Sequence, residues 1–238
     1  MNLAAKIILL PNLLIVLSVI CTQFIAMDLS EIRNNYLLHQ LDEEEAGANP
    51  VTFFLKWLSQ AIESEVTEPT AMVLSTISAD FKPKSRVVLL KGVIGEEFRF
   101  FTNYKSAKGV DISNNPVGSL LFFWKELERQ VRIEGSIEKI PPEESDAYFN
   151  TRPIESRLGA IISPQSMVVE NRAYLEGLFI SRSSELKSEE SIKRPQHWGG
   201  YALKPELIEF WQGRASRLHD RIRFRLVNDQ WIRERLAP

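Results

Sequence analysis

The segment Arg129–Ile140 is the part of the chain that most restricts its fold. Small or apolar residues there alternate with polar or charged ones, and the alternating apolar set is Val131, Ile133, Gly135 and Ile137. A period of two places the two sets on opposite faces of a β-strand, so the segment is predicted to have one buried and one wet face. Because parallel sheets are usually covered on both faces, this strand indicates an antiparallel sheet.

Other segments extend this sheet. Runs rich in β-branched, aliphatic or aromatic residues predict strands at Thr70–Ser78, Ser85–Lys91, Phe98–Thr102, Val117–Trp124, Trp198–Leu203, Leu207–Trp211, Ile222–Val227 and Trp231–Arg235. Helical spacing predicts helices over Leu29–Leu41, Pro50–Ser64, Pro141–Asn150, a segment opened by Pro153, and Ser166–Lys187. The connections between strands are short, which favours an antiparallel arrangement. We therefore predict one α+β domain over residues 27–238, an antiparallel β-barrel with helices packed around it.

The N-terminal residues form a separate question. From Ile7 to Met27 the chain has no charge and is mostly apolar, which is long enough for a bilayer span, and Lys6 before it also fits a signal peptide. Phe24 stands where cleavage after Ala26 would need a small residue. A third interpretation, which we favour, is that residues 1–26 are an upstream extension and that the protein starts at Met27. The lack of cysteine after Cys21 fits a reducing compartment, so a cytoplasmic protein is expected.

Composition excludes several function classes. There are 29 Lys and Arg residues against 31 Asp and Glu, a net charge of −2, which argues against a globally basic nucleic-acid binder. One cysteine and three histidines exclude a Cys-rich zinc site, and we expect no metal. Rossmann, P-loop, zinc-protease and nucleophile-elbow motifs are absent from the sequence. Redox chemistry would therefore need an organic cofactor.

Cations gather at strand ends and in turns of this near-neutral chain. They are Arg86, Lys91, Lys105, Lys108, Arg152 and the arginines of Arg214–Arg225. Each alone is most simply a solvated surface cation. Together they are suited to anions such as phosphate groups, which need several donors each.

Several strings in the same chain resemble the pyridoxine/pyridoxamine 5′-phosphate oxidase family. They are RVVLLK (86–91), FFTNYKSAKG (100–109), LERQV (127–131), YFNTRPIES (148–156), PQS (164–166), HWGGY (197–201), IEFWQG (208–213), RLHDR (217–221) and the terminal RLAP. The resemblance implies an FMN-binding split β-barrel that forms a homodimer with FMN at the subunit interface. It also implies oxidation of pyridoxine 5′-phosphate or pyridoxamine 5′-phosphate by molecular oxygen to pyridoxal 5′-phosphate, with release of hydrogen peroxide and, from the amine, ammonia.

The resemblance also implies roles for individual residues. FMN would be bound by Arg86, Val87, Val88, Leu89, Leu90, Lys91, Phe101, Thr102, Lys108, Gln130, Gln165, Ser166, Trp211 and Arg221. The substrate phosphate would meet Lys91, Tyr148, Arg152 and Ser156, and the substrate ring would meet Arg217, Leu218 and His219. Arg33 and Tyr36 would close over the substrate. Arg217 and His219 are the catalytic candidates, and which of them handles the proton stays open.

Two residues depart from the family pattern. Ala107 stands where the family usually has an arginine on the FMN phosphate, and Lys105 is a candidate to replace it. Arg214 replaces a glycine that is common after WQG. The alternatives to the oxidase are a non-catalytic binder of FMN or pyridoxal phosphate, another flavin reductase on the same barrel, and a nucleic-acid module that uses the arginine-rich C-terminus. We expect small-molecule substrates and neither a nucleic-acid nor a membrane partner.

Overall fold

The computed structural model of the chain describes residues 29, 31, 35–185 and 192–238. Residues 1–26, on which three interpretations stay open, and Arg33 lie outside the described residues. Residues from Tyr36 to Pro238 belong to one compact unit. Within the described ranges, none of the helices combines the length and the apolar character that crossing a bilayer requires.

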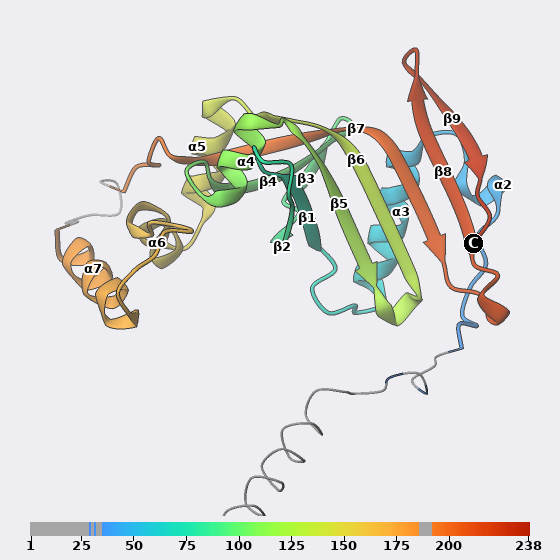
Figure 1. Cartoon of the computed structure of the whole chain (residues 1–238), viewed down its shortest axis with the longest axis horizontal. Helices are drawn as coiled ribbons and strands as arrows, with labels where there is room; N and C mark the ends of the chain where they lie inside the picture. Colours follow the sequence, from blue (N-terminus) through green and yellow to red (C-terminus); the bar gives the residue numbers. More distant parts are fainter. Residues whose placement is uncertain (1–28, 30, 32–34, 186–191) are drawn as a thin grey trace, which may run out of the picture. The chain divides into compact units, whose positions relative to one another are not determined.

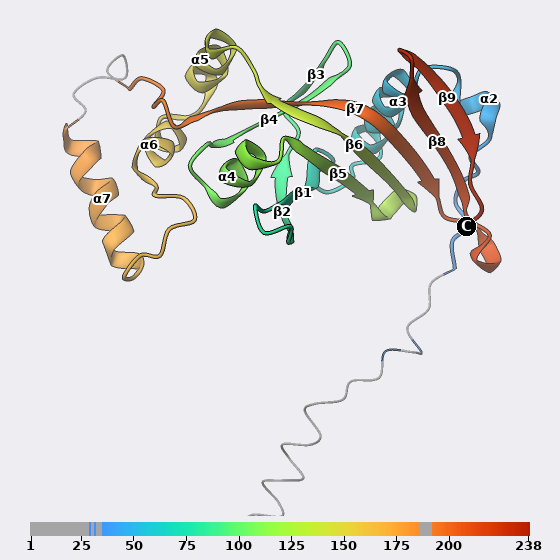
Figure 2. The same ribbon diagram turned by 45° about the horizontal axis from the view of Figure 1, so that its top comes forward.

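The described strands form one antiparallel sheet, which confirms the predicted α+β antiparallel fold (Figure 1). The sheet order is β2-β1-β5-β6-β7-β4-β3, and β8 pairs with both β7 and β9. The strands are β1 (Ala71–Ile77), β2 (Pro83–Leu89), β3 (Gly92–Ile94), β4 (Glu97–Asn103), β5 (Val117–Trp124), β6 (Arg129–Lys139), β7 (Trp198–Gln212), β8 (Asp220–Val227) and β9 (Gln230–Arg235). The sheet is curled into a split half-barrel, as Figure 2 shows.

The α-helices of the described residues are α2 (Glu43–Ala46), α3 (Pro50–Glu63), α4 (Ala107–Asn114), α5 (Pro142–Thr151), α6 (Ile154–Ile162) and α7 (Arg172–Glu185). Helix α3 begins with Asn49 as its N-cap and Pro50 in its first turn, two residues that favour helix starts. Its buried Phe54 packs on Phe98 of β4 and Phe122 of β5, with ring centroids 5.0 Å apart in both pairs. The main core therefore lies between α3 and the sheet.

Strand β7 is continuous, whereas the sequence predicted two strands separated at residues 204–206. The pairing with β6 shifts register at this point, because Glu134 faces Leu207 while Gly135 faces Pro205. Glu206 is thus an extra residue, a β-bulge that bends the strand without ending it. A side chain at Gly135 would place its Cβ 1.9 Å from the carbonyl oxygen of Lys204, so only glycine fits opposite the bulge.

Two helix predictions were wrong in their extent. Described residues from Tyr36 to Leu41 are not helical, because their backbone groups bond elsewhere: the N–H groups of Leu37 and Leu38 donate to Glu128 Oε2. Helix α7 begins at Arg172 instead of Ser166, since the Asn171 side chain accepts a bond from the Tyr174 N–H and caps the helix there.

Candidate active site

The cavity that concerns function has a volume of about 720 Å³ and lies where β2, β4, α4, α5 and α6 meet the start of β7. Most of its lining belongs to the residues that the sequence resemblance pointed to: Arg86, Val87, Val88, Leu89, Lys91, Phe101, Thr102, Lys108, Tyr148, Arg152, Ser156 and Gln165. These come from four separate strings of the sequence. The fold therefore gathers them into one hollow of ligand size.

One end of the cavity carries Arg86 and Lys108. Arg86 reaches back across the sheet, donating to Thr76 Oγ1 at 2.7 Å and lying 3.7 Å from the buried carboxylate of Asp111. Burial lowers the pKa of Lys108, and the positive charge of Arg86 lowers it further. Lys108 lies in the first turn of α4, whose N-cap is Ser106. Two desolvated cations beside a helix N-terminus form an environment that favours an anion.

The other end carries Tyr148 and Arg152. The rings of Phe101 and Tyr148 are stacked with centroids 3.8 Å apart, and the guanidinium of Arg152 lies 4.6 Å from the ring of Trp198. The Nη1 atom of Arg152 is buried and has no hydrogen-bond partner among the described residues. Burial lowers the pKa of Arg152, whereas the nearby Tyr148 raises it. A buried donor without a partner indicates that a ligand group completes this end.

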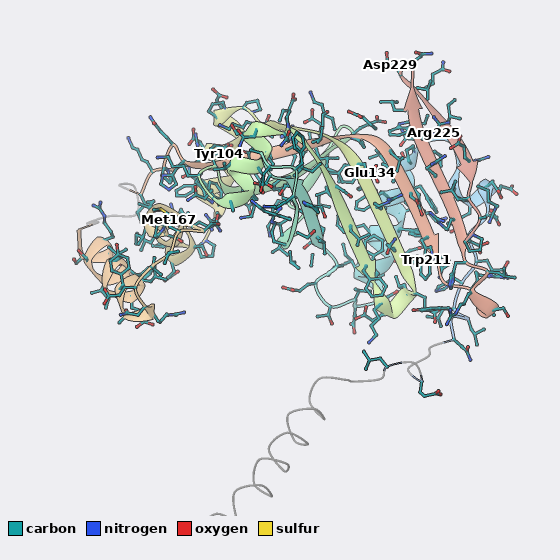
Figure 3. All side chains as sticks on the ribbon, viewed as in Figure 1. Tyr104, Glu134, Met167, Trp211, Arg225 and Asp229 are labelled. Carbon is teal, nitrogen blue, oxygen red and sulfur yellow. The ribbon has the colours of Figure 1, made fainter. Side chains whose placement is uncertain are left out.

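A second group of candidate residues lies elsewhere in the same chain. Gln130 of β6 faces Trp211 of β7, which in turn faces Arg221 of β8, so the three form a row across neighbouring strands. Register partners point to the same face of a sheet. Tyr36 packs edge-on against Trp211 and against His219, at 5.7 Å in both cases. In Figure 3, Trp211 is labelled near the part of β7 that lies beside β8.

His219 has a defined hydrogen-bonding state. The backbone N–H of Arg214 donates to Nδ1 of His219 at 3.1 Å, so the neutral ring keeps its proton on Nε2. Burial lowers the pKa of His219, the charge of Arg217 lowers it further, and Asp220 raises it. The lowered pKa favours the neutral ring. Ser216 and Arg217, just before it, have φ angles of 57° and 61°, a strained conformation for non-glycine residues that is common at functional sites.

The two groups lie at opposite ends of β7. Trp198 begins this strand and lines the cavity, whereas Trp211 stands near its end. Fifteen residues at about 3.3 Å each make roughly 50 Å of strand. Both ribbon views show β7 running from the side of α5 and α6 to the side of β8 (Figures 1 and 2). One small ligand therefore does not touch both groups of a single chain.

Some candidates lie away from both groups. Leu90 is buried in the core, and Ser166 and Lys105 are exposed and do not line the cavity. The cavity also has lining residues that sequence reasoning missed: Asn103, Gly159, Ala160, Ser163 and Trp198. Asn103 and Trp198 lie inside strings that resemble the family, and this resemblance could have identified them as candidate site residues. Nothing in the local pattern marked the three small residues of α6 and the turn after it.

Comparison with known proteins decides the family. The family model described as pyridoxamine 5′-phosphate oxidase matches residues 58–179, and the one described as pyridoxine 5′-phosphate oxidase C-terminal dimerisation region matches residues 198–238. The chain belongs to the pyridoxamine 5′-phosphate oxidase family. It is accordingly an oxidoreductase with the split-barrel fold of this family.

Relatives named pyridoxine/pyridoxamine 5′-phosphate oxidase are similar over almost their whole length. The protein of Leptospira biflexa is 54% identical, with 89% of this chain and 99% of the relative covered. That of Pseudomonas entomophila is 51% identical, with 88% and 98% covered. Among solved structures, PhzG of Burkholderia lata in complex with tetrahydrophenazine-1-carboxylic acid is 26% identical and has a TM-score of 0.78, covering 84% of this chain and 99% of that one.

Proposed function

We propose that this oxidoreductase oxidises pyridoxine 5′-phosphate and pyridoxamine 5′-phosphate to pyridoxal 5′-phosphate with FMN and molecular oxygen. The alcohol and one O2 give the aldehyde and hydrogen peroxide; the amine also takes up water and releases ammonia. The observation that carries the proposal is the single cavity lined by four cations, which are Arg86, Lys91, Lys108 and Arg152. Two phosphorylated ligands, cofactor and substrate, each need several such donors.

The cavity residues fit FMN and a phosphorylated pyridine. Arg86 and Lys108 would hold the FMN phosphate, because both are desolvated cations beside the N-terminus of α4. The unpartnered Nη1 of Arg152 would donate to the substrate phosphate, with Lys91 and the hydroxyls of Tyr148 and Ser156 beside it. When bound, FMN supplies the two-electron acceptor, which oxygen reoxidises. The protein supplies position and charge.

The row Gln130–Trp211–Arg221 would reach FMN from a second copy of the chain. Since about 43 Å of strand separates Trp211 from Trp198 within one chain, a homodimer would bring one subunit's row to the partner's cavity. The match of residues 198–238 to a dimerisation region supports this arrangement, because that region includes Trp211 and Arg221. FMN would then lie at the subunit interface.

His219 and Arg217 would act on the substrate ring. Because Nδ1 of His219 is occupied by the Arg214 N–H, the neutral ring offers only its Nε2–H, which is a hydrogen-bond donor. We therefore assign to His219 the role of donating to a substrate oxygen, and to Arg217 the role of positioning the ring by charge. Tyr36, packed on His219 and Trp211, would cover the substrate and exclude water.

Subunit complementation tests the proposal. Arg152→Glu damages the cavity half of the site, and Arg217→Ala with His219→Ala damages the other half. Each variant alone should be inactive, yet mixing equal amounts after dissociation should restore about a quarter of wild-type activity, since half the dimers are mixed and each has one intact site. If both halves came from one chain, mixing would restore nothing, and the shared-site proposal would be wrong.

Two further readouts on the wild-type protein separate the alternatives. Visible absorption measures bound flavin, and an oxygen electrode with peroxide detection measures turnover of both substrates. Bound FMN without turnover would indicate a non-catalytic binder. A flavoprotein that oxidises neither vitamer but reduces its flavin with a nicotinamide would indicate another flavin reductase.

A further inference from the structure

A buried carboxylate, Glu209 of β7, lies next to the row of candidate flavin residues. Its side chain is 4% exposed, and each of its two oxygens is taken by a different arginine. Oε1 accepts from Nε of Arg221 at 2.8 Å, and Oε2 accepts from Nη2 of Arg132 at 2.7 Å. A buried carboxylate held between two guanidinium groups fixes both of them in place.

The position of Glu209 follows from strand register. Arg132 of β6 and Glu209 are direct partners, two residues along from the pair Gln130 and Trp211. Residues two apart on a strand share a face, so the charged row lies on the same face as the candidate flavin row. Arg221, on the next strand, lies diagonally across from Glu209 and bonds to it along that face.

Leu236 and Ala237, near the C-terminus, also bond to Arg221. Its Nη1 donates to the carbonyl oxygen of Ala237 at 2.8 Å, and its own carbonyl accepts from the Leu236 N–H at 2.9 Å. Glu209 binds Nε and Nη2, so all three guanidinium nitrogens have a partner. A long arginine side chain that is 28% exposed thus has one orientation instead of many.

We infer that Glu209 is a positioning residue for flavin binding, which acts by holding the Arg221 guanidinium in the orientation that meets the cofactor. The inference rests on the proposed role of Arg221. Glu209 itself has both carboxylate oxygens occupied by arginines. Its effect on the cofactor therefore passes through Arg221.

The same sheet face contains a natural control. Glu234 of β9 also lies between two arginines, accepting from Arg223 at 2.6 Å and from Arg225 at 2.6 Å. Neither of these arginines belongs to the candidate site. Glu234 is more exposed than Glu209, at 30% against 4%, but a change there likewise disturbs a carboxylate between two arginines, without releasing Arg221.

The experiment measures the dissociation constant of FMN by quenching of its fluorescence on the apoprotein, for Glu209→Gln, Arg221→Lys, the double variant and Glu234→Gln. Glutamine keeps the shape, but its amide N–H₂ faces one of the arginines and cannot accept from it. We expect Glu209→Gln to weaken FMN binding about tenfold, with Glu234→Gln within about twofold of wild type. In the Arg221→Lys background, Glu209→Gln should add no more than about a twofold loss.

Each result has a defined meaning. Glu209→Gln that lowers the melting temperature of the apoprotein but leaves FMN affinity unchanged would overturn the inference, and so would full additivity with Arg221→Lys. If Arg221→Lys itself leaves FMN affinity unchanged, the proposed role of Arg221 fails and the inference fails with it. Should Glu209→Gln not fold, Glu209→Asp keeps the charge but shortens the side chain by one methylene, and it should weaken FMN binding in the same direction.

Discussion

Replacement of Arg152 by methionine should selectively remove recognition of the substrate phosphate. Methionine keeps an unbranched apolar side chain against Trp198 but has no charge and no donor. The Nη1 of Arg152 is buried without a hydrogen-bond partner among the described residues, and burial lowers the pKa of the guanidinium. This group therefore binds its ligand with little competition from water.

The size of the effect follows from the bond that is lost. A hydrogen bond to a charged group contributes about 1.5–3 kcal/mol, and leaving the phosphate without it lowers affinity by about 10- to 150-fold. Lys91 and the hydroxyls of Tyr148 and Ser156 remain at this end of the cavity. We therefore expect a higher KM for phosphorylated substrate and not a complete loss of activity.

The assay compares kcat/KM for pyridoxamine 5′-phosphate with that for unphosphorylated pyridoxamine, in wild type and in Arg152→Met. Because the unphosphorylated compound lacks the group that Arg152 would bind, its kcat/KM should change less than about threefold. The kcat/KM for the phosphorylated substrate should fall by about 10- to 150-fold. FMN affinity should stay unchanged. An equal loss for both compounds, or weaker FMN binding, would show that Arg152 does not recognise the substrate phosphate.

Two more predictions concern the cofactor and the proton. Ala107→Arg adds a cation in the first turn of α4 beside Lys108 and should tighten FMN binding by about 1.5–3 kcal/mol, measured by titration of the apoprotein; unchanged or weaker affinity would contradict it. Burial and Arg217 lower the pKa of His219, so kcat/KM should stay high at neutral pH and fall in acid, where a proton on Nδ1 removes the acceptor of the Arg214 N–H. In Arg217→Gln a positive neighbour is lost, and the His219 pKa, followed by NMR, should rise toward 6.5; a further fall would refute the assigned cause.

Much of the fold followed from local patterns in the chain. The alternation in Arg129–Ile140 predicted a strand with one wet face, and β6 has this pattern of burial. The segment Pro50–Ser64 was predicted as a helix, and its buried stripe packs on the sheet. Both elements follow from a periodicity that side-chain burial imposes, and such a periodicity is visible in a single sequence.

The remaining features depend on long-range contacts. Residues 36–41 are not helical because Glu128 and Asp220, distant in sequence, accept bonds from backbone N–H groups there. The separation of the candidate residues into two groups could not be read from the strings either. A string shows which residues resemble a site, but it does not show whether one chain or two bring them together. The course of β7 shows only that the two groups lie far apart along the strand within one chain.

The bulge at Glu206 has a consequence for how this protein can change in length. On either side of one extra residue, the in-and-out alternation of a strand is reversed. Deleting Glu206 would restore regular pairing with β6 and leave both halves of β7 on their present faces, but it would remove the bend that the bulge introduces. A single insertion or deletion far from the bulge would instead shift part of β7 by one residue against β6 and turn its side chains onto the opposite face. The turn at Asn228 and Asp229 carries no such restriction.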